Sequence, residues 1–153
     1  MSFRVVRLFF VFCVLWITQL SVANAQRPAP TGSLFPNRFT GRQIVVEVGS
    51  APDRPEYRLL DNGLLFYRKG SEGSFTQLGQ QRKDSTMKAF ARLEQECKIK
   101  TTRQEKPEKP DVTVSWKRAK TEFTVGWEKG QAPEIYKQFY ERFIALFPRI
   151  QRK

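Results

Sequence analysis

The sequence predicts an α+β domain, in which an antiparallel β-sheet of about five to six strands carries two α-helices on one face. Three observations predict this class: two hairpin patterns, a helical pattern between them and a second helical pattern after them. The expected order is strand, hairpin, short strand, helix, hairpin, helix. This order indicates a meander and a C-terminal hairpin, with the helices packed against the sheet.

The first hairpin occupies residues 57–68, where two β-prone apolar runs flank Asp61-Asn62-Gly63. An Asx-Gly pair between such runs is a strong short-range hairpin signal. A two-residue turn would pair Leu60 with Leu65, whereas a three-residue turn with a left-handed glycine would pair Leu60 with Leu64. The sequence leaves both registers open.

The second hairpin has the more regular pattern, because apolar and polar residues alternate on both of its strands over 112–127. A turn at Ala119-Lys120 places Trp116 opposite Phe123 on an apolar face and leaves the other face polar. Two further strands are expected at 43–49 and 75–78.

Two helices are expected from apolar residues that recur at helical spacing. The first begins at Asp84 or Ser85 as its cap, and the second runs from Pro133 until Pro148 stops it. The loop between the first helix and the second hairpin is rich in charge and proline, so we expect it to be solvated. The apolar faces comprise Met87, Phe90, Leu93 and Cys97 in the first helix, and Ile135, Phe139, Phe143 and Leu146 in the second.

The N-terminus has the pattern of a secretory signal peptide over residues 1–25. Arg4 and Arg7 precede an apolar run at 8–17, and Ala23 and Ala25 form the Ala-x-Ala cleavage site. The run is shorter than the roughly 20 apolar residues of a spanning helix, so we expect cleavage after Ala25 rather than a membrane anchor. The sequence therefore predicts a protein exported to the periplasm or the extracellular space, with no membrane-spanning segment after cleavage.

The remaining chain divides into a flexible proline-rich lead-in at 26–40, a single α+β domain at 41–148 and a basic tail at 149–153. The 153 residues include 27 Lys and Arg, 15 Asp and Glu, and no histidine. Loss of the signal peptide leaves 25 basic residues against the 15 acidic ones. A protein with this charge is expected to prefer anionic partners.

The absence of histidine excludes Ser-His-Asp and Cys-His catalysis and every metal site that contains histidine. The sequence also lacks dinucleotide-binding, P-loop, Cys-x-x-Cys and calcium-loop motifs. Glu94 and Glu96 are two residues apart on a helix and cannot converge as an acid pair. We therefore expect no catalytic residue, no metal and no cofactor.

Cys97 is the single cysteine of the chain that follows the signal peptide, so an internal disulfide is excluded. Its place on the apolar face of a helix favours a buried core thiol. The alternative is a reactive thiol or an intermolecular disulfide.

Two hypotheses on function remain. The favoured one is an exported non-catalytic domain that binds a protein partner or an anionic envelope component, with a patch of Lys117, Arg118 and Lys120 as its contact surface. The alternative is a small envelope enzyme that uses carboxylate or lysine chemistry, for which a deep cleft lined by acids would be diagnostic. Nucleic-acid binding fits the charge but conflicts with export.

The hairpin at 57–68 also suggests a partner surface. Leucine and aromatic residues make both of its faces apolar in either register. Helices can cover one face, and the other has to be covered by the lead-in, by a second layer or by another molecule. We expect this second face to contact a partner, unless it is buried within the monomer.

Several segments together resemble small exported proteins of unknown function from Bacteroidetes. The resemblance lies in the Tyr57 to Tyr67 segment, the helix after Asp84, the run Phe123-Thr-Val-Gly-Trp127, and Pro133 leading into Phe139-Tyr140. It covers most of the chain after the signal peptide. It implies a fold and a compartment, and it implies no activity and no site residues.

Overall fold

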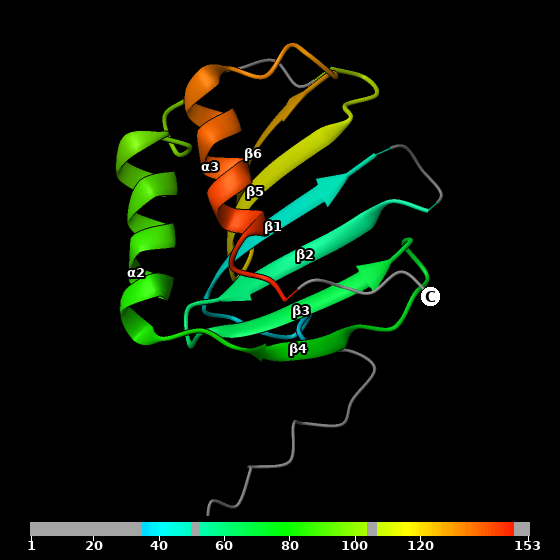
Figure 1. Cartoon of the computed structure of the whole chain (residues 1–153), viewed down its shortest axis with the longest axis vertical. Coiled ribbons are helices and arrows are strands. Elements are labelled where there is room, and N and C mark those ends of the chain that lie inside the picture. The colour runs from blue at the N-terminus through cyan, green and yellow to red at the C-terminus, as the bar shows by residue number, and fades with distance from the viewer. Residues whose placement is uncertain (1–34, 50–52, 104–106, 149–153) are drawn as a thin grey trace, which may run out of the picture. The chain divides into compact units, whose positions relative to one another are not determined.

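The computed structural model describes residues 35–49, 53–103 and 107–148, which form a six-stranded antiparallel sheet with two helices (Figure 1). The α+β prediction is therefore confirmed. The predicted signal peptide with Ala23 and Ala25, residues 26–34 of the lead-in and the basic tail lie outside the described residues. In chain order the elements are β1 (Arg42–Val48), β2 (Pro55–Leu60), β3 (Leu64–Lys69), β4 (Thr76–Gln80), α2 (Lys83–Ala91), η2 (Arg92–Glu96), β5 (Val112–Arg118), β6 (Thr121–Trp127) and α3 (Glu134–Ile144).

The strands lie in the order β4-β3-β2-β1-β5-β6, so β1 joins the two hairpins at the centre of the sheet. The β5–β6 hairpin has the register that its alternating pattern predicts, with Trp116 opposite Phe123. Ala119 begins the tight turn with a positive φ of 50°. The single-residue alternation along both strands specified this register, because a slip by one residue would expose the whole apolar face.

The β2–β3 hairpin has the three-residue turn, and Tyr57 lies opposite Tyr67. Gly63 adopts a left-handed φ of 89°, and its amide donates to the Leu60 carbonyl at 2.9 Å. A Cβ at this position would lie 2.6 Å from the Gln81 carbonyl oxygen. Both the turn and its packing against the connection to α2 therefore require glycine.

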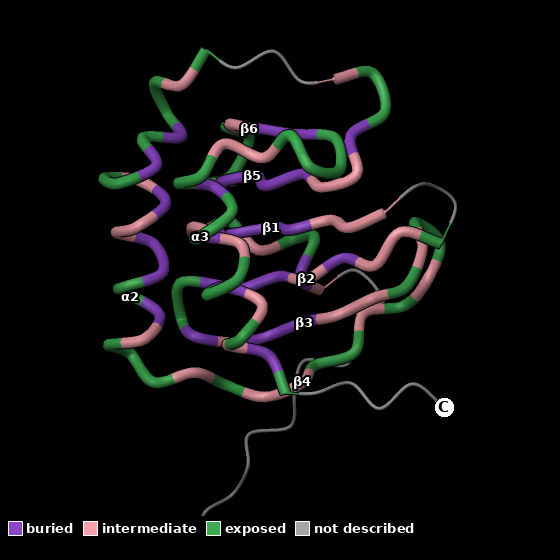
Figure 2. The backbone as a smooth tube through the Cα atoms, turned by 45° about the horizontal axis from the view of Figure 1, so that its top comes forward, coloured by how far each residue is buried: buried purple, intermediate pink, exposed green. Residues whose placement is uncertain are grey.

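Helices α2 and α3 pack against the same face of the sheet, and the main hydrophobic core lies between them and the strands (Figure 1). The ring of Trp127 packs against Tyr136 of α3 at a centroid distance of 6.0 Å. Figure 2 shows that burial follows the central strands and the side of α2 that faces them. The buried core residues from the helices and the segments that follow them are Ala89, Phe90, Leu93, Cys97, Ile99, Tyr136, Phe139, Phe143 and Phe147.

Two residues that were expected on the apolar helix faces are exposed. Met87 is 56% exposed and Ile135 is 45% exposed. A helix turns by about 100° per residue. The buried side of α2 is centred on Thr86 and Phe90, so Met87 lies at the edge of that side. In α3 the buried stripe begins at Tyr136, one residue later than expected.

The helix ends also differ from the expectation. Arg82 occupies the N-cap position of the first helix, and neither Asp84 nor Ser85 caps it. Pro133 is the N-cap residue of α3 and not part of its first turn, and the helix ends at Ile144. A proline suits this position because it has no amide hydrogen to leave unpaired.

The face of the sheet opposite the helices is covered near β2 and β3 by the segment Phe35 to Phe39. Leu60 is fully buried and Phe66 is 3% exposed, and the Phe35 ring meets Phe66 edge-on at 5.2 Å. Pro36 in the same segment is also buried. The expectation of an uncovered partner surface on this hairpin is therefore wrong, and this part of the predicted flexible lead-in is packed.

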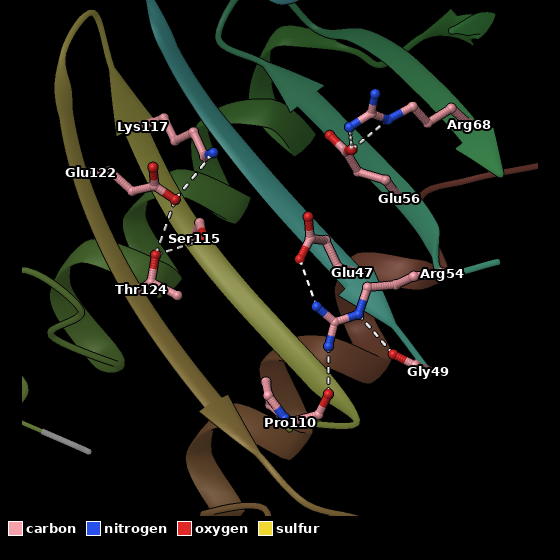
Figure 3. A network of polar contacts seen from close by, with 10 residues as sticks. All are labelled: Glu47, Gly49, Arg54, Glu56, Arg68, Pro110, Ser115, Lys117, Glu122 and Thr124. Atoms are coloured by element: carbon pink, nitrogen blue, oxygen red, sulfur yellow. Dashed lines mark hydrogen bonds and ion pairs between the residues drawn. The ribbon is translucent and has the colours of Figure 1, made fainter. Parts of the chain in front are cut away.

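Farther along this face, buried charges are paired. The Glu56 carboxylate is 4% exposed and binds both Arg58 and Arg68, with 2.5 Å to Arg68 Nη2. Figure 3 shows Glu56 and Arg68 on this face, with the helices behind the sheet. Both guanidinium groups lie over the Phe75 ring, at 4.5 and 4.6 Å from its centroid. Pairing and stacking offset part of the cost of removing these charges from water.

Cys97 is buried and forms no disulfide within the described residues, which confirms the core-thiol interpretation. Burial, together with the nearby charge of Glu96, raises the pKa of the thiol to about 11. In the chain that follows, Lys98, Lys100, Thr101 and Arg103 are exposed as expected, but Ile99 between them is only 1% exposed. The Tyr136 hydroxyl donates to the Cys97 carbonyl at 3.1 Å. The charge-rich composition of this loop gave no indication that Ile99 would be buried in the core.

Candidate functional site

A polar cavity of about 480 Å³ lies at the end of the sheet where β1 begins and β2 and β5 end. Side chains from four separate segments converge there. This volume is in the range of small-molecule pockets, which is about 300 to 1,000 Å³. The lining residues are Thr40, Gly41, Arg42, Asp61, Glu94, Lys100, Trp116 and Arg118.

Glu94 lines the cavity from the segment in which the first helix changes its winding. After α2 the chain continues as the π-helical turn η2, in which the Cys97 amide donates to the Arg92 carbonyl at 2.9 Å. A single π-turn widens the helix by one residue, which shifts side chains round its axis. As a result, the buried indole of Trp116 donates its Nε1 hydrogen to Glu94 Oε1 at 2.6 Å.

The same Glu94 oxygen is shared by two cations. It lies 3.3 Å from Lys100 Nζ and 3.6 Å from Arg42 Nη1. Arg42 also reaches Asp61 at 3.8 Å, and Lys100 lies 4.1 Å above the Trp116 ring. These ion pairs are partly exposed and hence weak, so the cations remain available to a second anion.

Gly41 shapes the entrance to the cavity. A Cβ at this position would lie 2.5 Å from the Phe39 ring and 2.9 Å from Asp61 Oδ1. Contacts this short force the neighbours to move. The close packing holds the chain before β1 against the β2–β3 turn, and Asp61 Oδ2 accepts the Arg42 amide at 2.9 Å.

Arg118 completes the rim as an exposed side chain at the end of β5. Within the part of the chain that the structure describes, no acidic side chain pairs with it. The rim therefore carries three cations against two acids, a formal charge of +1. Guanidinium groups bind carboxylates and phosphates through paired hydrogen bonds, so this arrangement suits a small anionic group.

The three cations of the predicted patch are not brought to one surface. Lys117 and Arg118 are consecutive on β5, so their side chains point to opposite faces. Lys117 lies on the face without helices and contacts Glu122 at 3.1 Å (Figure 3), whereas Arg118 lines the cavity. Lys120 is exposed in the turn. Of the three, Arg118 alone lines this cavity.

Glu122 pairs with Lys117 and with two hydroxyl groups. Burial raises the pKa of this carboxyl, but the hydrogen bond and charge of Lys117, with hydrogen bonds from Thr124 and Ser115, outweigh it and lower the pKa overall. Figure 3 shows the four side chains in one network across β5 and β6. Lys117 therefore has an acidic partner within the monomer, which Arg118 lacks among the described residues.

Arg42, Glu94 and Lys100 were missed as site residues from the sequence. Glu94 looked like one more polar residue on the solvated side of a helix, and Lys100 looked like part of a charged loop. No local motif joins positions so far apart along the chain. The local sequence Arg92-Leu93-Glu94-Gln95-Glu96 contains no signal that separates Glu94 from the other polar residues of the helix.

Comparisons with family models, with curated proteins and with solved structures find no match. Across residues 35–49, 53–103 and 107–148, no group of acidic or cysteine side chains is arranged to hold a metal ion. In the same ranges no helix has the length and apolar character needed to cross a membrane.

Proposed function

We propose that this protein is an exported, non-catalytic binding domain that holds an anionic group of an envelope component in the cavity of Arg42, Lys100 and Arg118. The group would be a carboxylate or a phosphate. The observation that carries the proposal is the Arg118 side chain, which lines the cavity without an acidic partner among the described residues.

Two further features support this function. Arg42 and Lys100 share one Glu94 oxygen, so each keeps donors that the protein does not use. The strongly cationic chain also attracts anionic surfaces over long range, which raises the rate of encounter. The signal-peptide pattern at the N-terminus supports an envelope location.

The test is binding by protein purified from cells that express the full-length chain. Three probes separate the sources of the anion: vesicles that contain phosphatidylglycerol, a polyuronate, and a poly-glutamate peptide. Arg118→Gln should weaken binding of the preferred probe roughly tenfold, the loss expected for one charge-assisted bidentate contact. Lys120→Gln is the matched control, because it removes one cation only two residues away but outside the cavity.

Equal losses from the two substitutions would overturn the proposal, because binding would then depend on total charge. Unchanged binding in Arg118→Gln would overturn it as well. A steep decrease with salt is expected in either case and so does not discriminate.

A carboxylate or lysine enzyme is the competing class. In this cavity one Glu94 oxygen already accepts the Trp116 indole hydrogen and contacts two cations, so its contacts within the protein are structural. Chemical change of the bound probe during prolonged incubation would refute the non-catalytic assignment.

A further inference from the structure

A second cavity, of about 590 Å³, lies at the opposite end of the same central strands. Its floor is apolar and is formed by Val48 at the end of β1, Val112 at the start of β5, Trp127 at the end of β6, and Tyr140 of α3. The first cavity begins where β1 starts and β5 ends, so the two sites share strands but no lining residue. An apolar floor with a few polar groups around it is the usual form of a small-molecule site.

Five charged side chains line this second cavity, and the protein leaves three of them without a side-chain partner among the described residues: Lys129 on the loop, and Lys137 and Glu141 on α3. Lys137 and Glu141 lie one helical turn apart on α3, and both line the cavity. Residues at this spacing commonly pair with each other on a helix. Within the described ranges, however, neither side chain forms an ion pair or a hydrogen bond.

The Tyr140 hydroxyl lies between these charges along the helix and makes no hydrogen bond to another described residue. Burial raises the pKa of this phenol, so it stays protonated at neutral pH and can donate a hydrogen bond. Tyr140 therefore places a neutral hydrogen-bond donor at the edge of the apolar floor, close to Lys137 and Glu141 on the same helix.

The strand side of this cavity is held in place from the other face of the sheet. Arg54 donates to the Gly49 carbonyl at 2.7 Å, binds the Pro110 carbonyl, and pairs with Glu47 at 3.0 Å (Figure 3). Gly49 lines the cavity, and Pro110 directly precedes Asp111, which also lines it. The Asp111 carboxylate accepts a hydrogen bond from the Lys129 amide at 2.7 Å. This bond holds the loop after β6 at the edge of the cavity. The site is thus preorganised.

We propose that this second cavity binds a small zwitterion with an apolar body, an apolar amino acid or a short apolar peptide. The ammonium group of the ligand pairs with Glu141, its carboxylate pairs with Lys137, and its side chains lie on the apolar floor. The argument is charge complementarity on α3: a ligand that carries both charges satisfies both Lys137 and Glu141, whereas an anion or a cation alone leaves one of these two residues unpaired.

The test measures binding by calorimetry with three matched probes: the dipeptide leucylphenylalanine, its N-acetyl form without the ammonium, and its C-terminal amide without the carboxylate. The free dipeptide should bind roughly tenfold more tightly than either blocked form, the loss expected for one charged contact. Glu141→Gln should bring the dipeptide to the affinity of the N-acetyl form. Lys137→Gln should bring it to the affinity of the amide.

Two substitutions serve as controls, Glu72→Gln and Lys88→Gln, because both residues are exposed and lie outside the cavity. They should leave dipeptide affinity unchanged. Equal affinity for all three probes, no binding at millimolar concentration, or equal effects of site and control substitutions would overturn the proposal. Failure of the zwitterion proposal would not affect the proposed anion site, because Arg118 lies at the other end of β5 from Val112.

Discussion

Glu94→Gln separates the two roles that the structure gives to this carboxylate. The amide oxygen of glutamine still accepts the Trp116 indole hydrogen, so the buried donor keeps its partner. The substitution weakens the contacts to Arg42 and Lys100, which are 38% and 40% exposed and contribute little to stability. We expect a stability loss of about 1 kcal/mol or less.

The same change should increase affinity for an anion. Loss of one acid takes the formal charge of the rim from three cations against two acids to three against one. One extra unit of charge within about 6 Å of the ligand contributes roughly 1 kcal/mol near a solvated surface, which corresponds to about fivefold tighter binding. A gain of function is informative, because general damage to the fold would weaken binding.

Two measurements on the same protein check this reasoning. Urea denaturation followed by tryptophan fluorescence gives the stability, and titration with the preferred anionic probe at fixed salt gives the affinity. Glu72→Gln removes a carboxylate from an exposed loop and controls for the change in net charge. Weaker anion binding by Glu94→Gln, or the same gain in the control, would refute the assignment of this cavity as the anion site.

Three further predictions concern stability. Gly63→Ala should cost about 2 to 3 kcal/mol in urea denaturation, because a Cβ would lie 2.6 Å from a backbone oxygen at a φ of 89°; Gly130→Ala, with a φ of 81° and open space around it, should cost only about 1 to 2 kcal/mol. Glu56→Gln should cost about 3 kcal/mol by the same assay, because it leaves the buried charge of Arg58 without its counter-ion; a loss below 1 kcal/mol would contradict this account. The thiol of Cys97 has its pKa raised from 9.0 to about 11, so the unfolded chain loses this proton first and stability should fall as pH rises from 9 to 11. A Cys97→Ala variant should show a shallower decline over that range, and an equal decline would show that other groups dominate.

Secondary structure was largely predictable because it depends on spacing within short windows. Alternation at every second residue specified the register of the β5–β6 hairpin. Helical spacing located both helices, but it misplaced Met87 and Ile135, since several apolar residues compete for one face and packing decides which is buried. The β2–β3 turn stayed open in the sequence, and contact with Gln81 favours the observed form.

The candidate sites could not be predicted in the same way. The anion cavity joins Arg42 of β1 and Arg118 of β5, which face each other across the paired strands, to Glu94 and Lys100 at the end of the first helix and just after it. The predicted patch relied on neighbours in sequence, and on a strand consecutive side chains point apart.

The sequence by itself determined the α+β class, the strands and helices, and the exclusion of histidine chemistry, because these depend on composition and on local periodicity. Only the tertiary structure decided that Phe35 covers the second face of the first hairpin, that a π-turn directs Glu94 to Trp116, and that Arg118 lines a cavity. The physical reason is that each of these is a contact between distant segments. Such contacts are selected by the packing and charge balance of the whole domain.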